Sequence, residues 1–205
     1  GAAYIPTDGN SSTDGQLFLQ ACLVNAKQRP AVDVGISVSR VGGAAQTKAL
    51  KKVSGTLKIS LAQYRSLESF AMFASDLDAA SKAQLTRGAR LTELLKQPQF
   101  SPFSMESEVV SVWAGTHGKL DDLELADVLP FEKAMLDYLD HNTDILKVIR
   151  DTEDFTADTE KSLNKAVDDF RTTYVTKAGK PLVEKKPDLR PDTPVEQEKI
   201  VAGEK

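Results

Sequence analysis

Residues 60–73 have the sequence SLAQYRSLESFAMF, and the hydrophobic pattern of the chain changes there to that of helices. Ser60 followed by Gln63 gives the capping-box pattern of a helix N-terminus. Apolar side chains then recur on one helix face, at Leu61, Tyr64, Leu67 and Ala71. The stretch therefore predicts a helix over residues 60–73.

The helical pattern continues to about Val175. Ser75 is the candidate N-cap of a second helix that extends to about Lys96 and ends before Pro98, with Asp78 in its first turn. Further helices are predicted over residues 105–116, 131–139, 143–150 and 157–175. Asn142 is the expected cap of the 143–150 helix, and the Asp121-Asp122 pair is expected to begin a short helix. The predicted fold class is mainly α, with a compact helical bundle over residues 58–175.

The two ends of the chain have a different texture. Residues 1–57 are rich in Gly, Ser and Thr, and short apolar runs such as QLFLQACLV and AVDVGISVS predict strands and loops. These strands are too few to close a sheet, so we expect a short remnant of a larger α/β domain. Residues 176–205 carry four prolines and mixed charges, which predict a flexible tail.

Composition excludes several classes of function. The net charge of -4 over 205 residues is too small to indicate binding to nucleic acid or to an anionic membrane. A single cysteine, Cys22, excludes an internal disulfide framework. The sequence has no apolar run of about 18 residues and no signal peptide, so we expect membrane association only through partners.

Catalytic patterns are scarce. In GISVSRVGGAAQTK, residues 35–48, the end resembles a phosphate loop, but Thr47 and Ala49 replace the glycine and the hydroxyl that such a loop requires. His117 and His141 lie far apart without other residues at metal-ligand spacing, so we expect structural or surface histidines and no metal site. Trp113, at helical spacing from valines, is expected in the core.

Several segments occur in an order and spacing that point to a known family. They are AYIPT, TDGQLFL, RPAVDVGISVSRVGGAAQTKALKKVSG, LAQYRSLESFAMFASDLDAASKAQLTRGARLTELLKQPQFSP and THGKLDDL. Together they resemble the C-terminal part of the alpha subunit of F-type ATP synthase, over residues 3 to about 174. The residues around 74–95 and the charged tail are most similar to actinobacterial members.

The resemblance implies a place in a rotary, proton-translocating complex. Alpha and beta subunits would alternate in a ring around the gamma shaft, with catalytic sites on beta and non-catalytic nucleotide sites on alpha. Residues 1–57 would then be the end of a RecA-like nucleotide-binding domain. The family binds ATP or ADP with Mg, whereas we expect no cofactor and no enzymatic activity in this fragment alone. The implied location is peripheral, on the cytoplasmic side of the bacterial plasma membrane.

The resemblance also assigns residues to the catalytic interface. The arginine of the family's S-V-S-R motif reaches the phosphates at the beta site, and here it is Arg40. A guanidinium is always charged and forks onto phosphate oxygens, so it can stabilise charge during phosphoryl transfer. The serine of V-I-S-I-T-D-G-Q falls by spacing on Ser11. From the residues alone, pairing of Arg40 with a local carboxylate is the alternative.

Two further groups of residues carry over. Arg29, Pro30, Gln97 and Gln99 match the lining of the non-catalytic adenine pocket, where amides offer both a donor and an acceptor to a purine edge. The alternative for the glutamines is a helix end followed by a turn.

The SDLDAAS loop, with Ser75, Asp76 and Asp78, corresponds to the acidic rotor-facing loop of the beta subunit. Two interpretations of this loop remain open: it contacts the shaft, or it is a simple turn between helices.

The sequence departs from the family pattern in three ways. The phosphate loop, the magnesium-binding acid and most of the nucleotide domain are absent. The family's T-N-V-I-S-I-T appears as TDGNSST at residues 7–13, a polar change that fits natural drift and also engineering for solubility. Val24 replaces an aromatic residue near the adenine pocket, which removes a stacking face.

Two classes of function are consistent with the sequence. The first is a non-catalytic alpha subunit that supplies Arg40 to a neighbour and couples nucleotide state to rotation. The second is an isolated helical interaction module whose tail, residues 176–205, restrains ATP hydrolysis by binding the rotor. The incomplete phosphate loop argues against an independent nucleotide hydrolase.

Overall fold

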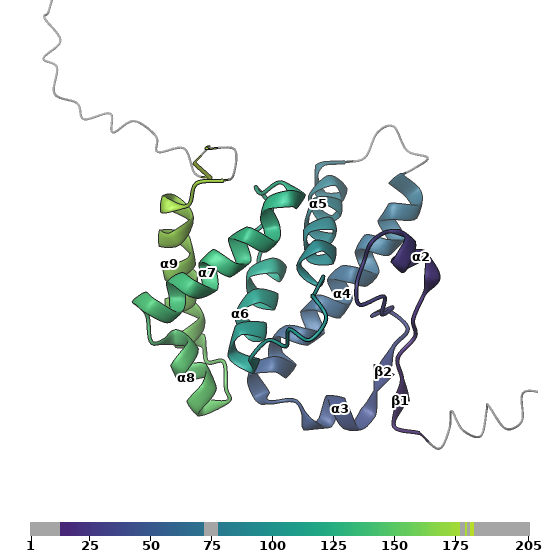
Figure 1. The fold of residues 1–205 in the computed structure, drawn as a ribbon, viewed down its shortest axis with the longest axis horizontal. Helices are drawn as coiled ribbons and strands as arrows, with labels where there is room; N and C mark the ends of the chain where they lie inside the picture. The colour runs from purple at the N-terminus through teal and green to yellow at the C-terminus, as the bar shows by residue number, and fades with distance from the viewer. Residues whose placement is uncertain (1–12, 72–77, 177–178, 180, 183–205) are drawn as a thin grey trace, which may run out of the picture.

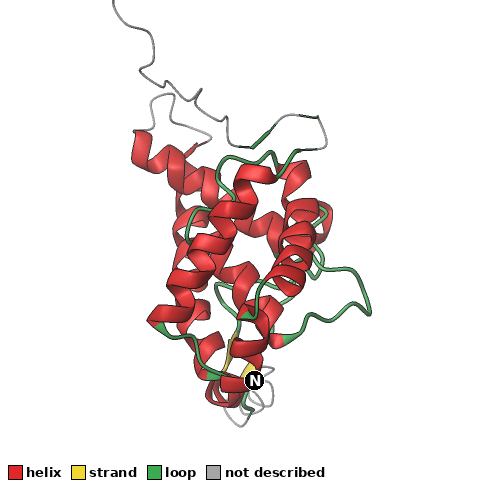
Figure 2. Ribbon diagram, turned by 90° about the vertical axis from the view of Figure 1, so that its left-hand side faces the viewer, coloured by secondary structure: helices red, strands yellow, loops and turns green. Residues whose placement is uncertain are grey.

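A computed structural model describes residues 13–71, 78–176, 179 and 181–182. Figure 2 shows that helices make up most of this part and that strand is confined to one short pair. In chain order the elements are β1 (Gly15–Gln16), α2 (Ala21–Asn25), β2 (Val38–Ser39), α3 (Arg40–Ala45), α4 (Lys48–Ala71), α5 (Ala79–Leu94), α6 (Met105–Thr116), η1 (Leu125–Asp127), α7 (Val128–Asn142), α8 (Ile145–Thr152) and α9 (Ala157–Thr173).

The long helix α4 lies between two unequal parts of the molecule. In Figure 1, helices α5 to α9 gather on one side of α4, and the N-terminal segment with β1, β2 and α2 lies on the other. The strands β1 and β2 pair antiparallel, with Gly15 opposite Ser39 and Gln16 opposite Val38. The mainly helical fold class that the sequence predicted is confirmed.

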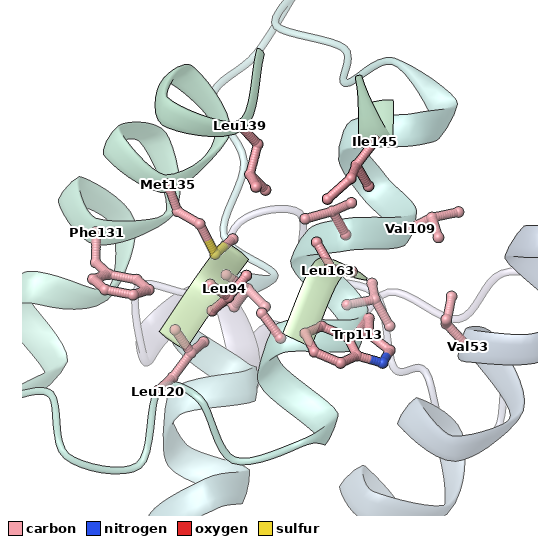
Figure 3. Close-up of a cluster of buried hydrophobic side chains, with 14 of the residues drawn as sticks. Val53, Leu94, Val109, Trp113, Leu120, Phe131, Met135, Leu139, Ile145 and Leu163 are labelled. Atoms are coloured by element: carbon pink, nitrogen blue, oxygen red, sulfur yellow. The ribbon is translucent and has the colours of Figure 1, made fainter. Parts of the chain in front are cut away.

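The core is centred on α6, whose side chains are buried on nearly every face. Trp113, expected in the core, is 2% exposed. Figure 3 shows it within a cluster to which α4, α5, α7 and α9 contribute side chains. The labelled members from these helices include Val53, Leu94, Phe131, Met135, Leu139 and Leu163. One apolar core therefore joins the helices that follow residue 48.

Helices α4 and α5 cross at a glycine. A Cβ atom added at Gly88 would lie 2.3 Å from the Tyr64 side chain, far inside van der Waals contact. A glycine in the middle of a helix lowers helix stability, but here it allows the two helices to pack closely. Gly55, in α4, has no such neighbour and is exposed.

The first predicted helix begins earlier than the sequence pattern indicated. Helix α4 starts at Lys48, so the capping box at Ser60 was wrong: its hydroxyl donates to the Thr56 carbonyl oxygen inside the helix, at 2.9 Å. Burial of Ala49 and Val53 against the core stabilises the extra turns despite a glycine among them. The helix runs without interruption through the expected domain boundary at residues 57 and 58, which stays a prediction.

Other helix ends also differ from expectation. Asp78 is the N-cap of α5, accepting from the Ser81 backbone N–H, and Ser75 lies outside the described residues. Asn142 does not cap α8: it is the last residue of α7, and its side chain donates to the Tyr138 carbonyl oxygen. Helix α6 over residues 105–116 is confirmed, α7 is longer than predicted, and α9 ends at residue 173.

The Asp121-Asp122 pair does not begin a helix. Both residues lie in a turn after α6, and each carboxylate pairs with an arginine of another helix, Asp121 with Arg87 and Asp122 with Arg171. Because both carboxylates pair with arginines, neither caps a helix. The prediction that this pair begins a short helix was therefore wrong.

The predicted strands of residues 1–57 form only in part. QLFLQACLV contains the second residue of β1 and most of the short helix α2, and AVDVGISVS contributes only the two residues of β2. A two-stranded pair is marginal by itself, because each strand lacks a second neighbour. The strand pattern in the sequence therefore predicts more strand than forms within residues 13–57.

Two buried carboxylates on neighbouring core helices have opposite surroundings. Burial opposes ionisation of Glu106, but hydrogen bonds from its own backbone N–H and from Arg150 outweigh it and lower the pKa. The Arg150 Nε atom lies 2.7 Å from the Glu106 carboxylate. Glu132 has no cation beside it in the described part of the chain, and burial raises its pKa, opposed only in part by the Ser111 hydroxyl.

Replacing Gly88 by alanine should lower the free energy of unfolding by about 1–3 kcal/mol, because the added methyl group overpacks the helix crossing. Gly55→Ala, a matched change in open space, should raise it by about 0.5–1 kcal/mol through helix propensity. Urea unfolding of both variants measures the two values. Equal effects of the two substitutions would contradict the close crossing.

Glu132→Gln should remove a pH-dependent loss of stability. The folded-state pKa of Glu132 is raised above its ordinary value of 4.5, so its favourable contribution is full below that value and is lost as the pH rises through the folded pKa. The variant should therefore match the parent at about pH 4 and be more stable than the parent at about pH 8. Urea unfolding of the parent and the variant between these two pH values tests the prediction. A difference in the free energy of unfolding that does not change with pH would refute it.

Candidate functional site

The four residues expected at the adenine pocket come together around one open hollow. Arg29, Pro30, Gln97 and Gln99 line it, together with the chain between Pro98 and Pro102, and its volume is about 700 Å³. Two segments far apart in the sequence thus meet at one place, before α3 and after α5. Spacing in the sequence alone does not predict this meeting.

Two hydrogen bonds by Gln97 fix the shape of the hollow. Its backbone N–H donates to the Arg29 carbonyl oxygen at 2.9 Å, which ties the two segments together. Its side-chain Nε2 donates to the Ser101 carbonyl oxygen at 2.6 Å and closes the loop on itself. Gln97 is therefore engaged, whereas Arg29 and Gln99 are exposed and make no side-chain hydrogen bond within the described residues.

Phe100 is a site residue that was not predicted from the sequence. Its backbone has a φ of 59°, in the left-handed region, and its ring is 93% exposed at the edge of the hollow. An exposed ring offers a stacking face for a planar base. Val24, which was expected to leave the pocket without such a face, lies on α2 and does not line this hollow. The position of Phe100 directly after Gln99 was the signal available in the sequence.

Arg40 is the first residue of α3 and lies on a separate part of the surface. Ser39 caps the helix: its hydroxyl accepts from the Gly42 backbone N–H at 3.1 Å. The Arg40 backbone N–H donates to the Asp14 carbonyl oxygen at 2.9 Å, which links the start of α3 to the strand β1 region. The backbone at Arg40 is thus held from two directions.

The Asp14 carboxylate accepts hydrogen bonds from backbone N–H groups and not from the guanidinium of Arg40. It accepts from the backbone N–H groups of Val41 and Gly42 and from the Ser39 hydroxyl, the latter at 3.0 Å. The Val41 hydrogen bond is the main cause that lowers the Asp14 pKa. Within the described residues the Arg40 guanidinium makes no hydrogen bond or ion pair. Its charge helps to lower the Asp14 pKa, and this is the extent of the support for a local carboxylate partner.

A buried carboxylate anchors this N-terminal segment to the helical bundle. Asp33 is 4% exposed and forms an ion pair with Arg65 of α4, and the Gln20 side chain also donates to it. Burial opposes ionisation of Asp33, but the Arg65 hydrogen bond and charge outweigh it and lower the pKa. Asp33 therefore stays charged at neutral pH and holds residues 20, 33 and 65 together.

The remaining predicted positions divide into two groups. Ser11, Ser75 and Asp76 lie outside the described residues, and so does most of the 176–205 tail. Asp78 is the N-cap of α5.

The two histidines have structural or surface positions. The His117 ring stacks on Trp113, with ring centroids 4.7 Å apart, and His141 lies on the surface with its ring nitrogen Nδ1 near the Asp137 carbonyl oxygen. In the described part of the chain, no cluster of three metal-ligating side chains occurs and no helix is long and apolar enough to cross a membrane.

Comparison with known proteins identifies the class. Residues 46–170 match the family described as "ATP synthase alpha/beta chain, C terminal domain", and the chain belongs to this family. Within it, the relatives that the chain resembles are alpha subunits. It is 84% identical over 204 residues to "ATP synthase subunit alpha" of Bifidobacterium adolescentis, covering 100% of the chain and 38% of that protein.

More distant relatives carry the same name. The chain is 58% identical over 207 residues to "ATP synthase subunit alpha" of Clavibacter michiganensis subsp. michiganensis, which covers 100% of the chain and 38% of that protein. The predicted resemblance to actinobacterial alpha subunits is confirmed. The chain spans less than two fifths of the length of these relatives.

ATP should bind this chain with a dissociation constant of about 1 mM or weaker, because the hollow is open and the chain supplies no phosphate loop. Phe100→Ala and Gln99→Ala should weaken even this binding, since they remove the stacking face and an amide. Isothermal titration calorimetry measures the ATP dissociation constant of the parent chain and of both variants. Micromolar ATP binding would contradict the prediction.

Proposed function

We propose that this chain is the C-terminal part of a non-catalytic alpha subunit of a rotary ATP synthase, and that Arg40 acts on nucleotide phosphates held by an adjacent beta subunit. One observation carries the proposal: the Arg40 guanidinium is exposed and forms no hydrogen bond or ion pair in the described residues, while its backbone is fixed by Asp14 and Ser39. Because the Arg40 backbone is fixed and its guanidinium forms no ion pair in the described residues, the side chain is positioned to act on a group across an interface.

The chemistry of the guanidinium fits this role. It stays protonated at all physiological pH values and presents planar donors that match phosphate oxygens in pairs. Charge spreads over the phosphoryl oxygens as the bond to the leaving group breaks, so a neighbouring cation lowers the barrier. The Asp14 carboxylate, whose pKa the Arg40 charge helps to lower, accepts hydrogen bonds from backbone N–H groups and forms no ion pair with the guanidinium.

The surface around Arg40 supports a contact with other protein. Leu17, Ile36, Val38 and Val41 are all more than half exposed, and they lie on or beside β1, β2 and α3. Exposed apolar side chains gathered in one region are typical of an interface. In the longer relatives this face would meet the rest of the nucleotide-binding domain and the neighbouring subunit.

The hollow at Arg29 and Gln99 is the proposed remnant of the non-catalytic nucleotide site. Its exposed amide, guanidinium and Phe100 ring offer hydrogen bonds and stacking to an adenine base. In the full-length subunit, ATP or ADP with Mg would be held there by the nucleotide-binding domain. Beta and gamma subunits are the proposed partners, in a complex peripheral to the cytoplasmic face of the plasma membrane.

The helical region is the proposed coupling element between nucleotide state and rotation. Helix α4 begins three residues after α3 and ends at Ala71, shortly before the loop expected to face the rotor. This arrangement connects the Arg40 region and the rotor-facing region through one helix. The inhibitory role of the 176–205 tail stays a prediction from the sequence.

Arg40→Lys should lower ATP synthesis and hydrolysis by about a thousandfold or more in the assembled ATP synthase, because lysine keeps the charge but loses the planar fork. Steady-state rates and complex assembly are measured together. Arg150→Lys is the control: it disturbs the Glu106 ion pair in the bundle and should leave turnover near normal. A near-normal rate for Arg40→Lys would reject the role of Arg40.

A further inference from the structure

A second cavity, distinct in lining from the Arg40 region, lies between α4, α5, α6, α7 and the loop after α5. Its volume is about 310 Å³, and its apolar walls include Leu57, Leu94, Phe103 and Val112. This volume is at the lower end of the range of small-molecule sites, which are mostly apolar with a few placed polar groups. The walls come from four helices and one loop, so the fold and not a single segment forms it.

Two buried polar side chains face this cavity, Ser111 and Glu132, and each is 5% exposed. The Ser111 hydroxyl has no partner at full hydrogen-bond geometry within the described residues, but it faces the Glu132 carboxyl closely enough to lower the pKa of that group. A hydroxyl has one donor and two acceptor lone pairs, so Ser111 can still accept a hydrogen bond from a group in the cavity while its own O–H points to Glu132. The Glu132 carboxyl lies beside it and has no cation of this chain to pair with in the described part.

The charged residues that line the cavity indicate which class of ligand it can bind. The cavity has two carboxylates, Glu108 and Glu132, and no lysine, arginine or histidine among its described lining residues. An anion would meet two like charges, one on the buried Glu132 and one on the exposed Glu108, which is unfavourable. A metal ion would require more charged ligands, whereas the apolar walls require an apolar body. A cation with an attached apolar group satisfies both the carboxylate and the walls.

We propose that this cavity binds a small organic amine, with its ammonium group between Glu132 and Ser111 and its apolar body against Leu57, Leu94 and Phe103. The ammonium N–H groups donate to the Glu132 carboxylate and to the Ser111 oxygen, whose lone pairs have no other donor in the described residues. Desolvation of Glu132, which raises its pKa in the empty cavity, is offset when a cation binds beside it. The inference does not depend on the role of Arg40.

The test uses three matched probes on the chain as it stands: 2-phenylethylamine, 2-phenylethanol and 3-phenylpropionate. Isothermal titration calorimetry at neutral pH should show millimolar or tighter binding of the amine. The alcohol should bind at least about tenfold more weakly, a difference of about 1.4 kcal/mol. The carboxylate should show no binding. Absence of amine binding, or equal binding of amine and alcohol, would overturn the proposal.

Variants of the chain separate the ion pair from nonspecific binding. Glu132→Gln has nearly the same shape and should weaken amine binding at least about tenfold, while Ser111→Ala should weaken it by about threefold. Glu124→Gln, at an exposed carboxylate outside the cavity lining, is the control and should change nothing.

Amide NMR shifts provide a second measurement and should localise the bound amine to the segments around Leu94 and Val112. Thermal unfolding confirms that each variant is folded. If Glu132→Gln is unfolded, the affinity of Ser111→Ala for the amine tests the site. Unchanged affinity in the cavity variants, or shifts confined to another surface, would refute the site.

Discussion

The buried ion pair between Asp33 and Arg65 determines how the two parts of this molecule are related. Asp33 belongs to the N-terminal segment that carries Arg29 and Arg40, and Arg65 belongs to the long helix α4. A carboxylate that is 4% exposed is unfavourable without a partner, so the segment is stable only where it meets the guanidinium. The position of both candidate nucleotide-binding regions therefore depends on this contact between a loop and a helix, together with the hydrogen bond from Gln97 to Arg29.

The sequence predicted helices well where apolar residues run through the whole helix, and less well where tertiary contacts decide the ends. The 105–116 helix is confirmed in full because it is buried almost all round. The start of α4 was missed because Gly55 and Ser54 weaken the local signal, while burial of Ala49 and Val53 supplies stability from outside the segment. Asp121 and Asp122 were misassigned because their arginine partners lie on distant helices.

The candidate site was predictable only to the extent that a family resemblance supplied it. Hydrogen bonding of Gln97 to Arg29 joins segments that are 68 residues apart, and no periodicity indicates such a meeting. Phe100 was missed because it is exposed and its backbone is left-handed, two features that are rare for a phenylalanine and that no pattern in the sequence indicates. The cavity at Glu132 had no signal in the sequence, since its walls come from four helices and a loop.

The length of α4 has a mechanical consequence. At 24 residues it is a strut of about 36 Å, and an α-helix resists bending because its hydrogen bonds run along its axis. It is fixed to α5 in its last third, where Tyr64 packs on Gly88, and its first turns are fixed by the buried Ala49 and Val53. A helix held at two points would pass a push on its end near Ala71 to the core as a rigid body and would not absorb it by bending.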